Sequence, residues 1–244
     1  MIKTNKATLA VASALSVLTI GTLAVPTSVY AADSTASVTF KANDNPTSPV
    51  DPENPDNPFT PDKPATGEKG PLSIDYVSDL NFGSQEITTK DATYNAALTS
   101  GKDASGTAKN TPNFVQITDN TGASLGWSLK VQQVQQLSSA NDQLKGAEIS
   151  FANLQAVTNS ASDAIAPAVA AGIKLVPGVD SPVTTAAANQ GEGTWVTRFG
   201  KDATEGAASV QLSVPGASVK KATTYSSTLK WTLTQTPDSN NAIK

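Results

Sequence analysis

A serine with the sequence neighbours of a hydrolase nucleophile lies near the middle of the chain. Ser124 stands in GASLG, residues 122–126, which matches the G-x-S-x-G pattern. Such a serine needs a strand–turn–helix elbow and a base that accepts its proton, most often histidine. The chain contains no histidine, and a strand-like pattern follows Ser124 instead of a helical one. The match is therefore coincidental, and the sequence assigns no catalytic residue.

Acidic side chains are the other residues that could support hydrolysis, as the carboxyl pair of a glycoside hydrolase. That chemistry needs one protonated and one ionised carboxyl group about 5–9.5 Å apart in a cleft. The acids of residues 70–244 lie mostly in loop-like stretches, such as those around Asp103 and Asp202, and no aromatic-rich segment surrounds them. A hydrolase is kept as an alternative, but the sequence favours a protein that is not an enzyme.

Metal and cofactor sites have little support in the sequence. Cysteine and histidine are both absent, which excludes thiolate and imidazole ligands as well as disulfides. A calcium loop needs closely spaced oxygen ligands, as in D-x-D-x-D-G, and no such run occurs. The sequence therefore predicts neither a metal nor a cofactor, and it predicts a core that is stable without covalent cross-links.

A repeated aromatic pattern is the most specific feature of the chain. Two of the three tryptophans stand in the arrangement Leu-x-Trp-x-Leu, once at residues 125–129 and once at residues 229–233. In a strand, residues two apart face the same side, so each tryptophan would share a face with its leucines, and Val131 would extend the first set. That face is either core or an aromatic binding surface. The flanking leucines favour the core, more clearly for Trp231 than for Trp127.

The first thirty-one residues have the composition of a secretory signal peptide. Two lysines provide a positive start, an apolar run follows at residues 7–25, and VYA at residues 29–31 places small residues at the −3 and −1 positions of a cut. We expect cleavage after Ala31. The alternative is an uncleaved membrane anchor, although serine, threonine and glycine within the run weaken it as a span. No later segment is apolar enough to cross a membrane.

Charge and composition limit the partners of the mature chain. Removing residues 1–31 removes two lysines and no acids, so the net charge changes from −4 to −6. A protein that binds nucleic acid would carry a basic domain or patch, so nucleic acid is not expected as a partner. With 38% hydrophobic and 16% charged residues, the chain has a polar but weakly charged surface.

Residues 32–69 are expected to form an acidic, proline-rich linker. Prolines recur at every third position from Pro46 to Pro64, which matches the three residues per turn of a polyproline II helix. We therefore predict a stiff, extended arm that does not pack on the rest of the chain. Val38 and Phe40 also allow a short strand at residues 32–42. A proline-rich ligand for a partner module is the alternative.

From residue 70 onward, short alternating segments separated by Gly, Asn, Asp and Pro indicate strands. They centre on residues 74–76, 80–82, 114–118, 125–131, 147–151, 173–175, 195–199, 210–214 and 229–233. We expect a hairpin-like pair from 114–118 and 125–131, a loop at 99–110, one short helix at 131–137, and an exposed ring for Trp195. Many short strands are typical of an antiparallel β-sandwich or barrel, so the fold class is all-β, with one domain over residues 70–244.

The second Leu-x-Trp-x-Leu segment resembles the signature of a known family. YSSTLKWTLTQTP at residues 225–237 is similar to the distal signature, and WSL at residues 127–129 to the proximal signature, of the WxL-domain surface proteins of low-GC Gram-positive bacteria. The proline-rich stretch ending in GPLSID also resembles this family, so the resemblance extends from about residue 33 to residue 237. It singles out the candidate binding residues Trp127, Leu129, Tyr225, Leu229, Trp231, Leu233 and Pro237.

The resemblance implies a secreted protein that attaches non-covalently to the cell wall, usually to peptidoglycan. It also implies surface complexes with other WxL proteins and a membrane-anchored partner, which would serve adhesion or other contacts with a host or the environment. The alternative is a structural interaction protein that binds those partners, so that its wall localisation is indirect. The motif tryptophans either build the fold or form the recognition surface, and the sequence leaves both open.

Overall fold

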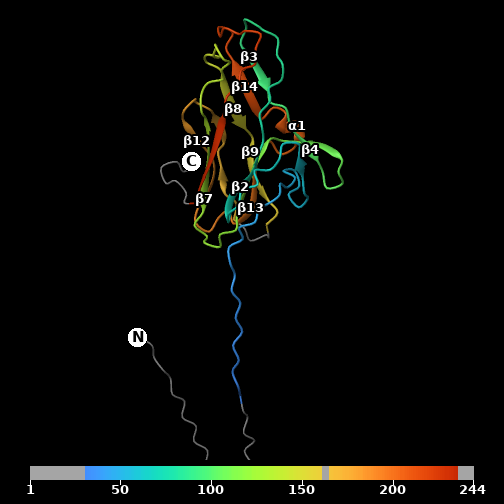
Figure 1. Cartoon of the computed structure of the whole chain (residues 1–244), viewed down its shortest axis with the longest axis vertical. Helices are drawn as coiled ribbons and strands as arrows, with labels where there is room; N and C mark the ends of the chain where they lie inside the picture. The colour runs from blue at the N-terminus through green and yellow to red at the C-terminus, as the bar shows by residue number, and fades with distance from the viewer. Residues whose placement is uncertain (1–30, 161–164, 236–244) are drawn as a thin grey trace, which may run out of the picture. The chain divides into compact units, whose positions relative to one another are not determined.

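The computed structural model describes residues 31–160 and 165–235 (Figure 1). Residues 31–39 form a separate exposed part without regular secondary structure, and the compact unit begins at Phe40. Among the described residues are fifteen strands and one short helix, α1 (Ala203–Gly206), too short to cross a membrane. Every strand pair in the sheets is antiparallel, so the prediction of an all-β antiparallel fold is confirmed. Residues 1–30 of the predicted signal peptide lie outside the described residues, and cleavage after Ala31 stays a prediction.

The sheet that contains both motif strands has β7 in an interior position. β7 pairs with β12 on one side and with β15 on the other, and β10 pairs with the far edge of β12. Its strands are β10 (Ala168–Val169), β12 (Asp180–Ala186), β7 (Trp127–Gln133) and β15 (Leu229–Thr234). β7 is largely buried, whereas β15 alternates half-buried and exposed residues. The second motif therefore lies at the border between core and solvent.

Three further sheets complete the fold. One has the order β11 (Gly172–Lys174), β8 (Glu148–Ala152), β14 (Val210–Val214) and β3 (Ala92–Asn95). Another has the order β2 (Leu72–Val77), β6 (Phe114–Asp119), β13 (Gly193–Phe199) and β9 (Leu154–Thr158). The smallest consists of β1 (Thr60–Pro61), β4 (Thr99–Lys102) and β5 (Ala108–Thr111). The strands thus divide among four sheets, which is not a defined two-sheet sandwich.

Several local predictions are wrong. β6 and β7 follow one another in the chain but lie in different sheets, so they form no hairpin. Residues 99–110 form the β4–β5 hairpin instead of a loop, because the Asp103 carboxylate accepts backbone N–H groups of Ser105 and Thr107 at 2.9 Å and closes the turn. β7 continues to Gln133 where a helix was expected. No strand forms at 80–82 or at 32–42, where the side chain of Phe40 is 88% exposed.

The main hydrophobic core lies against β7. Trp127, Leu129 and Val131 are completely buried and share one cluster with side chains from β8, β12, β13 and β14. Trp195 on β13 belongs to the same cluster and is only 3% exposed, so the expectation of an exposed ring is wrong. Its indole N–H donates to the carbonyl of Glu192 at 3.0 Å, which closes the preceding turn over the ring.

The proline-rich segment folds onto the compact unit. Val50 and Pro58 form an antiparallel bridge, so the chain reverses direction between them, and β1 pairs with β4. Phe59 is 2% exposed and packs edge-to-face on Phe114, with 6.2 Å between ring centroids, in a second cluster with Tyr76 and Val196. The prediction of a stiff arm clear of the domain is therefore wrong for this stretch.

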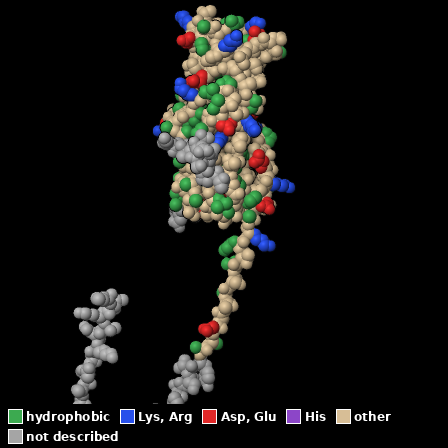
Figure 2. Space-filling view, turned by 90° about the vertical axis from the view of Figure 1, so that its left-hand side faces the viewer, with side chains coloured by type: hydrophobic (Ala, Val, Ile, Leu, Met, Phe, Trp, Pro, Cys, Tyr) green, Lys and Arg blue, Asp and Glu red, His purple; other side chains and the backbone are tan. Residues whose placement is uncertain are grey.

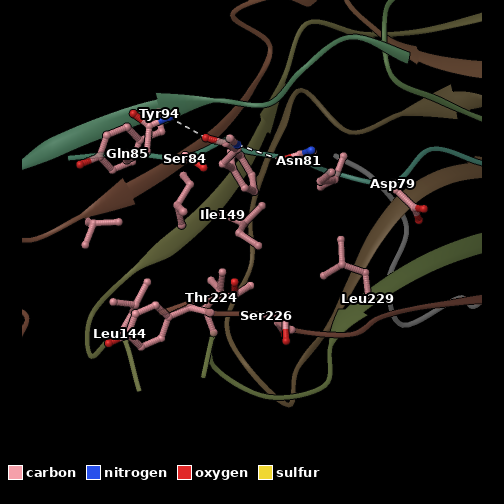
Figure 3. A pocket seen from close by; sticks show the side chains of 18 of the residues that line it. Asp79, Asn81, Ser84, Gln85, Tyr94, Leu144, Ile149, Thr224, Ser226 and Leu229 are labelled. Atoms are coloured by element: carbon pink, nitrogen blue, oxygen red, sulfur yellow. Dashed lines mark hydrogen bonds between the residues drawn. The ribbon is translucent and has the colours of Figure 1, made fainter. Parts of the chain in front are cut away.

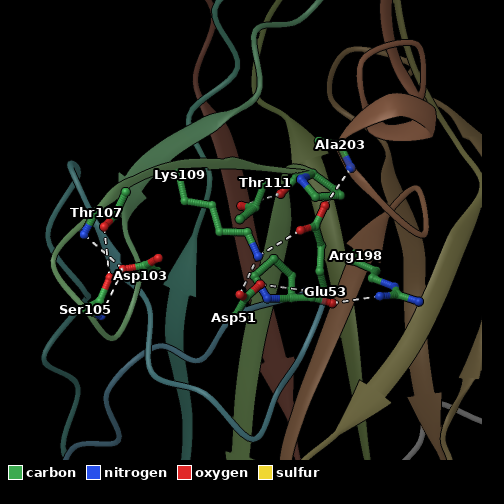
Figure 4. Close-up of polar contacts among 11 residues, drawn as sticks. Asp51, Glu53, Asp103, Ser105, Thr107, Lys109, Thr111, Arg198 and Ala203 are labelled. Atoms are coloured by element: carbon green, nitrogen blue, oxygen red, sulfur yellow. Dashed lines mark hydrogen bonds and ion pairs between the residues drawn. The ribbon is translucent and has the colours of Figure 1, made fainter.

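Polar contacts fix the same segment at its turn (Figure 4). The Lys109 ammonium lies 2.5 Å from Asp51 and 2.8 Å from Glu53. Burial alone would lower the pKa of Lys109, but the hydrogen bonds that its ammonium donates to both carboxylates, together with their charges, outweigh burial and raise that pKa. Arg198 donates to the carbonyl of Pro52 at 2.9 Å, and the backbone N–H of Ala203 donates to Glu53 at 2.7 Å. Strands β5 and β13 and helix α1 thus all hold this turn.

We predict that Phe59→Ala destabilises the domain, whereas deletion of residues 32–39 does not. Truncating a buried phenylalanine costs about 3–5 kcal/mol, which lowers the melting temperature by roughly 10 °C in a domain of this size. Residues 32–39 are exposed and carry no strand, so their loss should shift melting by no more than about 2 °C. Differential scanning calorimetry checks both, with the exposed neighbour variant Thr60→Ala as control. Equal melting of Phe59→Ala and the unmodified chain would contradict the packing of this segment.

Candidate functional site

The two motif strands are direct neighbours. β15 pairs with β7 so that Trp231 lies opposite Val131 and Leu233 lies opposite Leu129. Residues directly opposed in an antiparallel pair share a face of the sheet, so Trp231 lies on the same face as the buried side chains of the first motif. The pairing joins positions far apart in sequence, such as Ser128 and Thr234, which are 106 residues apart. The repeated pattern therefore builds one continuous apolar face from two distant segments.

The first motif tryptophan is sealed inside that face. Trp127 has 0% exposure, and its indole N–H donates to the carbonyl of Gly191 at 2.9 Å. Gly191 has φ +70°, and a Cβ there would lie 2.7 Å from the Trp127 indole nitrogen, so only glycine fits. Leu125, expected on the same face, precedes β7 and is 48% exposed. Trp127 is therefore a structural residue with no surface for a ligand.

A groove of about 860 Å³ lies beside the second motif (Figure 3). Residues 77–87 form one wall and residues 220–229 the other, and Trp231 on β15 contributes to the lining. The figure shows Asn81, Ser84, Gln85 and Tyr94 on one side, and Thr224, Ser226 and Leu229 on the other, with Ile149 between them. The volume is within the range of about 300–1,000 Å³ that is usual for ligand sites.

Trp231 is half-buried and held by stacking within the fold. Its ring lies nearly parallel to that of Phe151, at an angle of 10° and a centroid distance of 6.4 Å. Phe151 in turn stacks on Phe199 at 4.9 Å. Since this stack fixes the indole, binding a ligand against Trp231 would cost little side-chain entropy.

Hydrogen bonds hold both walls of the groove. On one wall, Ser226 and Ser138 exchange backbone hydrogen bonds at 2.9 Å, and the backbone N–H of Lys221 donates to the Tyr225 hydroxyl at 3.0 Å. On the other wall, the carbonyl of Asn81 accepts from Ala97 at 2.7 Å. The groove is thus built by ordered segments on both sides.

The charged groups at the groove have partners. Lys63 pairs with Asp79 at 2.5 Å, and Lys221 pairs with Asp142 at 2.7 Å. The hydrogen bond that the Lys221 ammonium donates to Asp142 raises the pKa of Lys221, so that lysine stays protonated. The Lys220 ammonium donates to three backbone carbonyls, those of Pro215 at 2.9 Å, Ser218 at 3.0 Å and Gly216 at 3.5 Å. These lysines are therefore not arranged as a free anion-binding cluster.

Acid–base chemistry has no evident centre in the groove. The acids that line it are Asp79, which is paired, and Glu86. Burial raises the pKa of Asp75, more than its hydrogen bonds with Thr118, Gln116 and Ser73 lower it, but Asp75 is not part of the lining. Within the described residues, no group of three or more acidic side chains could hold a metal ion.

The structure brings together some of the residues that the sequence singled out. Tyr225, Leu229 and Trp231 line the groove, whereas Trp127 and Leu129 are buried behind it and Leu233 is not part of its lining. Pro237 lies outside the described residues. Sequence reasoning missed Tyr94 and the wall at residues 79–87. Tyr94 lies on the short strand β3, and the alternation within ATYN is the only sequence feature that could have indicated that strand. A role in binding stays a prediction for Tyr94 and for the candidate residues named from the sequence.

We predict that Trp127→Ala is much more destabilising than Trp231→Ala. Removing the fully buried ring of Trp127 leaves a cavity and an unpaired carbonyl at Gly191. The free energy of unfolding should therefore fall by about 3–5 kcal/mol. Trp231 is partly exposed, and its truncation should cost about 1–2 kcal/mol. Urea unfolding of both variants measures the difference. Equal losses would contradict the distinction between a sealed and a groove-lining tryptophan.

A family model described as WxL domain surface cell wall-binding matches residues 27–237. No curated protein and no solved structure matches the chain. The family match covers nearly the whole chain, including both motif strands and the two walls of the groove. The chain therefore belongs to the WxL domain surface cell wall-binding family.

Proposed function

We propose that this chain is a secreted, non-enzymatic surface protein that attaches non-covalently to peptidoglycan, and that the groove beside β15 makes the contact. Family membership supports association with the cell wall at the cell surface. One observation supports the groove as the contact: Trp231 is the motif tryptophan that borders it, whereas Trp127 has no exposed surface. The half-buried aromatic ring and the surrounding hydroxyl groups are suited to binding without chemistry on the ligand.

A second function has its own supporting observation. β15 is an edge strand of its sheet in the part of the chain that the structure describes, and Lys230, Thr232 and Thr234 on it are exposed. An edge strand can pair with a strand of another protein. The alternative is therefore a structural interaction protein that binds sister WxL proteins or a membrane-anchored partner through this edge. Either function fits a surface complex that serves adhesion or contact with a host or the environment.

We predict that protein-stripped peptidoglycan sacculi retain the purified mature chain. Trp231→Ala should weaken this binding at least about fivefold, which corresponds to a loss of about 1 kcal/mol of binding free energy. Thr232→Ala, on the same strand but pointing the other way, is the matched control and should bind normally. Melting temperatures of both variants show whether each remains folded. Retention only by sacculi that keep their surface proteins would reject direct wall binding and favour the alternative.

We also predict that wall binding depends weakly on salt. Because the lysines at the groove are paired, binding should change less than about threefold between low and physiological ionic strength, where the screening length falls from roughly 30 to 8 Å. Co-sedimentation at several salt concentrations measures this. The triple variant Lys220→Gln, Lys221→Gln, Lys230→Gln should bind like the unmodified chain. A steep loss with salt, removed by these substitutions, would instead assign binding to a local basic patch.

A further inference from the structure

We propose that the groove holds an uncharged stretch of polysaccharide, with one sugar ring stacked on Trp231, and does not hold an anionic phosphate polymer. The inference rests on the proposed wall-binding function and specifies the chemistry of its ligand. Cell walls offer neutral amino-sugar chains and anionic phosphate-linked chains as very different ligands. The side chains of the groove discriminate between them.

The groove has a net charge of only +1, from Lys63, Lys220 and Lys221 against Asp79 and Glu86, and its lysines are already engaged, so it offers little to a phosphate polymer. The three lysines that line it already interact with Asp79, Asp142 or backbone carbonyls. A phosphate would have to share these lysines with their present partners, and Glu86 on the same wall would repel it. Phosphate sites in proteins normally offer unpaired cationic side chains or backbone N–H groups. The cation is often an arginine that donates two parallel hydrogen bonds to the phosphate. The lining contains no arginine at all.

The aromatic and polar groups of the lining match a neutral sugar. Trp231 and Tyr94 provide half-buried rings, and in the described residues neither the Trp231 indole N–H nor the Tyr94 hydroxyl has a hydrogen-bond partner. Sugar rings present apolar C–H faces and equatorial hydroxyl groups, so they can stack on an aromatic ring and accept or donate at its polar edge. Asn81, Ser84, Thr224 and Ser226 add amide and hydroxyl groups along both walls (Figure 3).

The fluorescence of one tryptophan, Trp231, can report on binding in the groove. Trp127 is 0% and Trp195 is 3% exposed, so Trp231 is the tryptophan that a solvent quencher can reach. Acrylamide quenching of the full mature chain therefore reports on the groove. In the Trp231→Phe variant, the accessible component of the fluorescence should disappear while the aromatic platform remains.

The experiment compares two probes of opposite character. A hexamer of β-1,4-linked N-acetylglucosamine serves as the neutral probe, and poly(glycerol phosphate) serves as the anionic one. We expect the neutral probe to protect Trp231 from acrylamide at all salt concentrations, and the anionic probe to give no protection. By calorimetry, Trp231→Phe should keep the affinity for the neutral probe within a few-fold, Trp231→Ala should weaken it at least about tenfold, and Thr232→Ala should not change it.

Two results would overturn the inference, and they differ from failure of the proposed function. Protection by poly(glycerol phosphate) but not by the neutral hexamer would assign the groove to an anionic polymer. Protection by neither probe, with intact binding to stripped sacculi, would place the wall contact elsewhere on the domain. Loss of sacculus binding by the unmodified chain would instead reject the proposed wall attachment itself.

Discussion

The ladder between β7 and β15 is the interaction on which the rest of the structure depends. β7 is buried because strands cover both of its edges and packed side chains cover its faces, and β15 supplies one of those edges. Its register places Trp231 beside Val131, so that the indole reaches Phe151 on one side and the groove on the other. The two copies of the motif are therefore complementary parts of one sheet. One copy is buried for stability, and the other stays near the surface.

The sequence predicts the strands that carry regular apolar alternation, and it fails where tertiary contacts replace that signal. The segments around Trp127, Trp195 and Trp231 read correctly as strands because large apolar residues recur two apart. The sequence did not predict β12, because polar residues of this strand are buried and interrupt the apolar alternation. Thr184 is one of them, and a hydrogen bond satisfies its hydroxyl group, which lies 2.6 Å from that of Thr197. The β4–β5 hairpin was missed because its turn is closed by one carboxylate, which composition does not reveal.

The candidate site was half predictable for a related reason. Tyr225, Leu229 and Trp231 belong to a pattern that the sequence displays openly, so they were identified. Tyr94 comes from a segment with no such pattern, and the pairing of β3 with β14 brings it to the groove. The wall at residues 77–87 starts at the end of β2, and its part in the groove depends on tertiary packing. The proline-rich segment shows the same limit. A proline at every third position suits an extended rod, but Val50, Phe59 and the carboxylates of Asp51 and Glu53 hold the segment on the domain.

The distance along the chain between β7 and β15 also fixes the order in which the domain can be completed. Contacts of high sequence separation form late, because the intervening loop must be ordered first. During synthesis, β7 is complete long before β15 is made, so this edge of β7 stays open until the last strand is available. The indole of Trp231 reaches its place only after β15 has emerged. The groove therefore takes its final shape only after β15 has joined the sheet, because Trp231 and Leu229 on that strand line it.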